Sequence, residues 1–151
     1  MKVSPEPHLI ETEASESGVI SLPQGLIGLP GYTQGELLAL PDNPPFLLLK
    51  LTGPLGTLNF VVVEPGGLVS DYEPELFDAD AASIDIQDPA DALVLNVVTL
   101  CPTSPLEATM NLIGPIVINR RTRAGRQVVI ANNSRYSARH FLIEDAASRR
   151  D

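Results

Sequence analysis

The sequence of 151 residues contains no tryptophan, one cysteine and few aromatic residues. A single cysteine cannot form an intramolecular disulfide, so the composition indicates a reducing compartment. No stretch approaches the roughly 20 apolar residues that a membrane helix requires, and the first residues lack the apolar core of a signal peptide. We therefore expect a soluble cytoplasmic protein that does not associate with membranes.

Cations are scarce in the first 110 residues, which hold 16 Asp and Glu but only Lys2 and Lys50. Residues 111–151 reverse this balance with 8 Arg and 3 acids, so the two parts carry −14 and +5 of the net −9. Nucleic-acid binding depends on cations that neutralise phosphates, which disfavours direct contact with RNA. The acidic surface suits a basic protein partner, although a surplus of one charge can also serve solubility alone.

Long helices are disfavoured by 14 prolines and by the short apolar segments that recur between turns. Segments of four to nine residues rich in β-branched side chains are typical of strands. We predict strands at 18–22, 46–51, 58–63, 92–100, 116–118 and 127–131. A tight hairpin is expected at 53–56, and a second turn at Ala124-Gly125. The fold class is therefore all-β, a single small antiparallel β-barrel-like domain of about ten short strands.

One segment resembles a helix, since Asp78 can cap an alanine-rich run that extends to Ser83. We expect at most one short helix, near residues 78–83. Residues 144–151 are polar and lack a pattern, which predicts a frayed C-terminal tail. The remaining residues, 1–143, are expected to form a single domain.

Groups that could perform nucleophilic catalysis do not form a motif. His8 and His140 are not paired with a nucleophile in sequence and are expected near frayed ends. Cys101 stands at the end of an apolar strand, so we expect it to be a buried small hydrophobic residue rather than a nucleophile. We therefore predict no enzymatic activity. The alternative is a small β-barrel enzyme, or a ligand- or carbohydrate-binding domain, with its pocket in the barrel mouth.

Motifs for metals and phosphates are incomplete. Asp78, Asp80 and Asp85 lack the glycine turn and terminal glutamate of a calcium loop. The glycine-rich segment 25–31 lacks the Gly-Lys-Ser/Thr ending of a phosphate-binding loop. We predict no metal and no cofactor. Four arginines between Arg120 and Arg126 form the one basic cluster, interpreted as solvated turn residues or as a contact for an acidic ligand.

An acidic segment containing an aromatic residue is the strongest surface motif. Asp71, Glu73 and Glu75 surround Tyr72, and Pro74 marks an edge strand rather than a central one. An edge that presents tyrosine among carboxylates suits recognition of a basic protein. The alternative is that Tyr72 simply packs over the edge.

The order of the motifs resembles the FliW family of flagellar assembly factors. The resemblance covers about residues 8–143, and its most specific part is Asn-Leu-x-x-Pro-Ile-Val-Ile-Asn followed by Gly-x-Gln-Val-Val. The matching pieces are 22–29, 45–49, 60–65, 71–73, 98–99, 111–119, 125–129 and Tyr136. The chain departs from the family at Leu22 and Leu29, where an aromatic residue is common, and at Gly66-Gly67, where the loop is often bulky.

The resemblance implies a β-rich protein without enzymatic activity that binds the RNA-binding translational repressor CsrA and antagonises it allosterically. It also implies binding of flagellin before export, as a chaperone does, so that flagellin translation is coupled to flagellar assembly. On this basis the expected partner-binding residues are Asp71, Tyr72, Glu73 and Glu75. Second candidates are Asn111, Pro115 and Asn119, whose alternative role is to hold a strand register and a turn.

Overall fold

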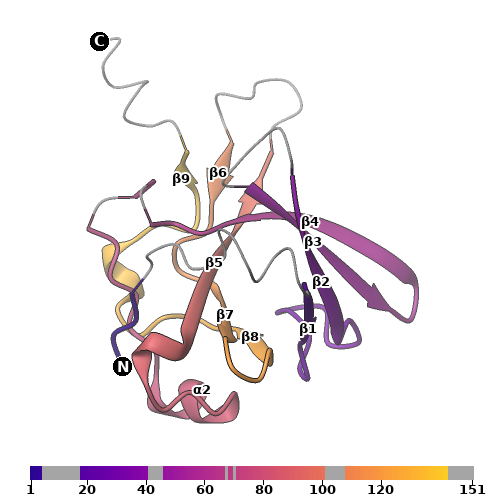
Figure 1. The fold of residues 1–151 in the computed structure, drawn as a ribbon. Helices are drawn as coiled ribbons and strands as arrows, with labels where there is room; N and C mark the ends of the chain where they lie inside the picture. Colours follow the sequence, from indigo (N-terminus) through magenta and orange to yellow (C-terminus); the bar gives the residue numbers. More distant parts are fainter. Residues whose placement is uncertain (5–17, 41–45, 67, 70, 101–107, 143–151) are drawn as a thin grey trace.

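A computed structural model describes residues 1–4, 18–40, 46–66, 68–69, 71–100 and 108–142 (Figure 1). His8, Gly67, Cys101 and the tail 144–151 lie outside these residues, so the predictions made for them are not tested here. Within the described residues, no helix is both long and apolar enough to cross a membrane.

Nine strands, all paired antiparallel, form one sheet in the described residues. They are β1 (Val19–Ser21), β2 (Gln34–Ala39), β3 (Phe46–Gly53), β4 (Gly56–Val63), β5 (Ala92–Thr99), β6 (Thr109–Met110), β7 (Ile116–Asn119), β8 (Gly125–Gln127) and β9 (His140–Phe141). Their order is β1-β2-β3-β4-β5-β6-β9, with β7 on β5 and β8 on β7. The predicted all-β, antiparallel, barrel-like class is confirmed.

The sheet curls, and its two ends meet at one point. Ser21 in β1 forms a single parallel bridge with Ala124 beside β8, and the Ser21 N–H donates to the Arg123 carbonyl at 2.9 Å. The inner face of the curl holds one hydrophobic core, which includes Leu49, Leu95 and Ile118. The result is a barrel-like shape, which this bridge and hydrogen bond help to close.

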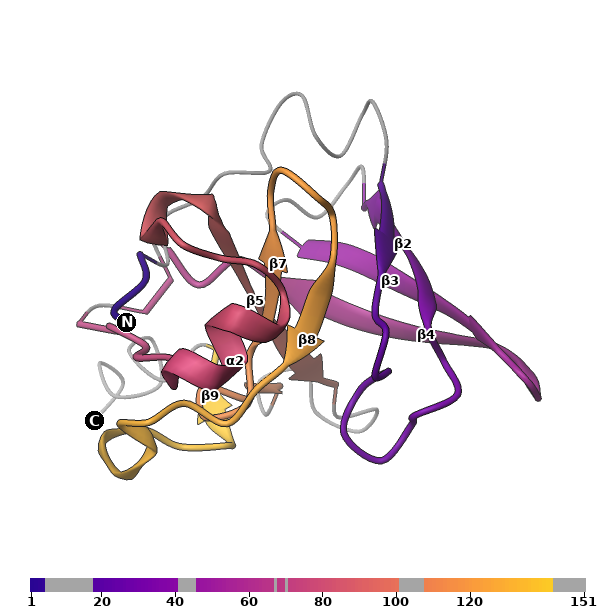
Figure 2. The ribbon, with the colours of Figure 1, turned by 90° about the horizontal axis from the view of Figure 1, so that it is seen from below.

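A second core lies on the other face of β5 and β7. It includes Val94 and Val117 and is completed by Tyr72 and the short helix α2 (Asp78–Ser83). Figure 2 shows α2 lying beside the β7–β8 hairpin, away from β2, β3 and β4. Because β5 contributes to both cores, seven of its eight residues are apolar or buried, which explains its long hydrophobic run, broken only by the buried Asn96.

The β3–β4 hairpin is confirmed, with Gly53 opposite Gly56 and Gly56 at φ +115°. The second predicted turn is misplaced, because the chain reverses at residues 120–123 and Gly125 already belongs to β8. Asn119 explains the shift: its side-chain Oδ1 accepts from the N–H groups of Arg121 and Thr122 at 2.9 and 3.3 Å. Such side-chain bonds stabilise a turn directly after asparagine.

Other local predictions are confirmed in part. The helix spans the predicted residues, but its N-cap is Phe77 rather than Asp78. Asp78 stands in the first turn, where its negative charge interacts favourably with the helix dipole. Two 3-10 turns, Pro89–Asp91 and Asn133–Arg135, add short helical elements. His140 lies in β9 opposite Met110, so the expectation of a frayed position is wrong for this histidine. The strand expected at 127–131 ends at Gln127.

Candidate partner-binding surface

The acidic segment 71–75 bends at Asp71 and runs extended from Tyr72 onward, but it forms no regular strand in the structure. Along one side it meets the first residues of the chain: the Val3 N–H donates to the Pro74 carbonyl at 3.1 Å, and Lys2 forms an isolated bridge with Glu75. The Leu76 N–H also donates to the Met1 carbonyl, at 2.7 Å. The edge predicted from Pro74 is therefore covered.

The opposite side of the segment is held by Asn132. Its Nδ2 donates to the Glu73 carbonyl at 2.8 Å, and its Oδ1 accepts from the Glu75 N–H at 3.0 Å. In an extended chain the carbonyl of one residue and the N–H two residues later point to the same side. The side-chain amide of Asn132 therefore substitutes for a neighbouring strand. The next contact is the Ala131 N–H, which donates to the Glu75 carbonyl at 2.7 Å.

The Tyr136 hydroxyl fixes the beginning of the segment. It accepts from the Glu73 N–H at 2.9 Å and donates to the Asp71 carbonyl at 3.2 Å. Asp71 has φ +60°, a left-handed conformation that costs free energy for a residue other than glycine. The Tyr136 hydroxyl, bound to both Asp71 and Glu73, therefore holds a backbone bend that the local sequence does not favour.

The side chain of Tyr72 points inward from the segment and is only 2% exposed. Its hydroxyl donates to the Leu112 carbonyl at 2.6 Å and accepts from Asn96 Nδ2 at 3.3 Å. Its ring meets the ring of Tyr136 edge-on, with centroids 4.9 Å apart. Burial raises the pKa of Tyr72 to about 12, and the Asn96 hydrogen bond opposes part of this rise. The structure thus shows the alternative geometry, in which Tyr72 packs under the edge rather than facing solvent.

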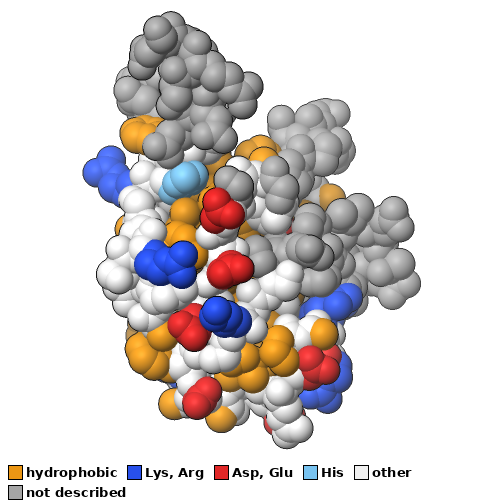
Figure 3. All heavy atoms as spheres, turned by 90° about the vertical axis from the view of Figure 1, so that its left-hand side faces the viewer, with side chains coloured by type: hydrophobic (Ala, Val, Ile, Leu, Met, Phe, Trp, Pro, Cys, Tyr) orange, Lys and Arg blue, Asp and Glu red, His pale blue; other side chains and the backbone are white. Residues whose placement is uncertain are grey.

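The carboxylates are what this segment presents to solvent. Asp71 and Glu73 are exposed and Glu75 is half-buried. Figure 3 shows this side of the molecule, where acidic side chains are interspersed with basic ones rather than gathered into a purely acidic patch. The surface is therefore a rigid backbone that carries carboxylates in a mixed-charge setting.

The second group of candidate residues has structural contacts. Asn111 is half-buried, and its Oδ1 accepts from the N–H groups of Ile113 and Gly114 at 3.1 and 2.9 Å. Pro115 is buried, and its carbonyl accepts from the Val128 N–H. Asn119 is fully buried. These positions match the alternative role in strand register and turn formation, and a partner can reach Pro115 and Asn119 only after rearrangement.

The basic turn lies against the acids that precede β5. Arg121 Nε lies 2.9 Å from Asp91 Oδ2, and Arg126 lies 3.6 Å from Asp80. Arg126 also donates to the Ser83 hydroxyl of α2 at 3.1 Å. Part of the positive charge is thus offset locally, which weakens the case for RNA binding through the turn. No three His, Cys, Asp or Glu side chains converge on a possible metal site within the described ranges.

Comparison with known proteins places this arrangement in a family. The family model described as FliW protein matches residues 5–142. The chain belongs to the FliW family. The flagellar assembly factor FliW of Natranaerobius thermophilus is 34% identical over 149 residues, covering 99% of this chain and 97% of that protein. The FliW of Clostridium botulinum is 33% identical over 136 residues, covering 89% and 92%.

A solved structure agrees with the fold of this FliW-family chain. The crystal structure of a flagellar assembly factor FliW matches with a TM-score of 0.74 and 29% identity, covering 94% of this chain and 96% of that one. Within this fold, the sequence identified the acidic segment but not its supports. The contacts of Asn132 and of residues 1–3 were not predicted, because no local signal links these residues to a segment 57 to 75 residues away in sequence.

Proposed function

We propose that this chain is a non-enzymatic cytoplasmic flagellar assembly factor that binds the repressor CsrA and antagonises it allosterically. It also binds flagellin before export and so couples flagellin translation to assembly. The observation that supports the repressor contact is the acidic segment 71–75, whose exposed carboxylates stand on a backbone that is hydrogen-bonded along both sides. Asp71, Glu73 and Glu75 form the contact, and Tyr72 supports it from below.

Charge gives this contact its physical basis. An RNA-binding protein must display cations, so a partner of net charge −9 is steered toward it. A pre-organised segment loses little conformational freedom on binding, which favours affinity. Docking beside the RNA site of CsrA also brings negative charge near the phosphates of bound RNA, which the charge repels. Exchange of the repressor for flagellin needs a coupling free energy on the order of 1–3 kcal/mol between the two binding events.

Binding kinetics test the proposal with one variant and one matched control. Glu73→Lys reverses an exposed charge on the segment, while Glu36→Lys makes the same charge change on β2, in the strand that pairs with β3. We expect Glu73→Lys to slow association with CsrA by roughly three- to tenfold at low salt, with a smaller change in dissociation. Glu36→Lys should have a clearly weaker effect.

Two outcomes would contradict the proposal at different levels. If the unaltered protein forms no complex with CsrA at micromolar concentration and low salt, the repressor function is wrong. If a complex forms but both variants associate like the unaltered protein, the function stands and the contact lies elsewhere. Release of flagellin leader RNA from CsrA on addition of the protein is the functional readout.

A further inference from the structure

Several segments of this charged protein contain no charged residue, and two of them carry exposed apolar side chains at one end of the sheet. Residues 19–35 and 51–63 lack Asp, Glu, Lys, Arg and His throughout, in a chain that is 19% charged. The first segment comprises β1, the loop before β2 and the first two residues of β2, and the second comprises the end of β3, the hairpin tip and β4. Neither segment is used by the acidic surface described above.

The fold brings these two segments together at one end of the sheet. A Cβ atom at Gly31 would lie 3.1 Å from ring carbons of Pro54 at the hairpin tip, and a Cβ atom at Gly53 would overlap the ring of Tyr32. The glycines therefore allow the loop to lie directly against the hairpin. We call the surface formed by residues 22–33 and 52–57 the uncharged end.

Large apolar side chains project from the uncharged end. Leu55 is 91% exposed and Ile27 is 62% exposed. The position of Ile27 is fixed, because its N–H donates to Gln127 Oε1 at 3.0 Å while Gln127 Nε2 donates to the Gly114 carbonyl. A hollow beside Ile27 is lined by the same loop together with Arg126 and Gln127. The end thus offers Ile27, held by its backbone beside a depression, and a second exposed apolar side chain, Leu55, at the hairpin tip.

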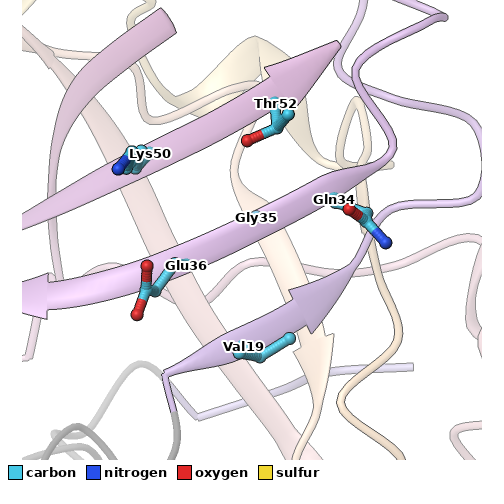
Figure 4. A pocket seen from close by; sticks show the side chains of 6 residues that line it. All are labelled: Val19, Gln34, Gly35, Glu36, Lys50 and Thr52. Carbon is cyan, nitrogen blue, oxygen red and sulfur yellow. The ribbon is translucent and has the colours of Figure 1, made fainter. Parts of the chain in front are cut away.

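The sheet face shows where the charges begin. Figure 4 shows Gln34 and Thr52 side by side on this face, with Glu36 and Lys50 next to them. The register pairs Gln34 with Thr52 and Glu36 with Lys50. The uncharged surface therefore extends from the loop and the hairpin tip to the Gln34–Thr52 row, and the first acid and base lie one row farther along.

We propose that the uncharged end is the docking surface for unassembled flagellin, separate from the acidic segment that contacts CsrA. This assignment rests on the proposed function. Charge depletion and exposed apolar side chains mark the centre of protein interfaces. A subunit that will polymerise carries, before assembly, apolar surfaces that later become buried between subunits. Such a surface matches an end whose own loop and hairpin residues are uncharged and which Arg126 borders at the hollow, whereas a cationic RNA-binding protein matches the acidic segment.

Separate surfaces have a mechanistic consequence. The two partners then do not exclude one another by occupying the same residues, so exchange requires two conformations or steric contact between the bound partners. One stretch of chain connects the two surfaces and could transmit a conformational change between them. Gln127 holds the loop from β8, and the chain then runs through Ala131 and Asn132 to the acidic segment.

The test measures the affinity of the full-length chain for purified flagellin and for purified CsrA in parallel. Ile27→Asp/Leu55→Asp places two charges in the uncharged end. Leu100→Asp/Phe141→Asp is the matched control, because these apolar side chains are 61% and 45% exposed and belong to the β5–β6–β9 region. All four side chains are exposed, so both variants should fold, which circular dichroism and thermal unfolding check.

We expect Ile27→Asp/Leu55→Asp to weaken flagellin binding at least about tenfold and to change CsrA affinity much less. The control should retain both affinities within about threefold, and Glu73→Lys should affect CsrA alone. Unchanged flagellin binding by Ile27→Asp/Leu55→Asp would overturn the assignment. The assignment would also be overturned if the unaltered protein self-associates and this variant is monomeric. The surface would then bind a second copy of the chain instead of flagellin. Failure of the unaltered protein to bind flagellin would instead refute the proposed function.

Discussion

Removal of one hydroxyl group, in Tyr136→Phe, should loosen the acidic segment without unfolding the protein. The hydroxyl bonds the Glu73 N–H at 2.9 Å and the Asp71 carbonyl at 3.2 Å. Each bond contributes about 0.5–1.5 kcal/mol, and water can replace part of both because the bonded groups are exposed. The phenylalanine ring keeps the edge-on contact with Tyr72. We therefore expect the free energy of unfolding to fall by about 1–2 kcal/mol.

Hydrogen exchange gives the sharper measurement, because the local effect should exceed the global one. The Glu73 amide should exchange faster in Tyr136→Phe than the global loss of stability explains, while amides in β3 and β5 should follow the global change. Tyr32→Phe, in the other core, is the control and should leave the Glu73 amide unchanged. Unaltered protection of Glu73 in Tyr136→Phe would refute the inference that this hydroxyl holds the bend. A loss above about 4 kcal/mol would show that the ring itself had moved.

Two further predictions concern buried polar groups. The pKa of Tyr72 is raised from 10.0 to about 12, so the free energy of unfolding should be independent of this group below pH 10, where both states are protonated. It should then fall by up to about 3 kcal/mol as the pH rises through 12, because only the unfolded state ionises in between; urea unfolding at pH 8–12 should show this slope, and Tyr72→Phe should lack it. Asn119→Ala should lower stability by about 2–4 kcal/mol, since it removes bonds to the Ile84 and Asp85 carbonyls and to the turn. The exposed Asn59→Ala on β4 is its control, and equal losses in both variants would contradict the role of Asn119.

Sequence patterns predicted those elements whose signal is local. β5 could be recognised because burial on both faces produces an apolar run that only Asn96 breaks, and the β3–β4 hairpin because glycine stands at both ends of its turn. β2 was missed, since Gln34, Gly35 and Glu36 interrupt its apolar pattern. The strand at 127–131 was drawn too long because Val128 and Ile130 are buried, yet their N–H groups donate to Pro115 and Ile113 outside any regular ladder.

The sequence of the acidic segment itself indicates which side chains face outward. Asp71, Glu73 and Glu75 alternate with Tyr72, Pro74 and Leu76 in the sequence. In an extended chain, alternate side chains point to opposite sides, so three outward acids require an inward tyrosine. The structure has this arrangement, with Tyr72, Pro74 and Leu76 buried. The supporting contacts from Asn132 and Tyr136 were not predictable, because they depend on how distant segments fold together.

The distribution of charge in space differs from its distribution along the chain. The acidic first part and the basic last part do not form two poles, because the 120–123 turn and β8 lie beside α2 and the 3-10 turn that precedes β5. Arg121 and Arg126 are thereby brought close to Asp91 and Asp80. The acids of the 71–75 segment remain displayed on a mixed-charge face. The loop 22–33 and the hairpin tip 52–57, in contrast, contain no charged residue. The docking proposed above for two partners of different surface chemistry therefore requires no overlap of their contacts on this small domain.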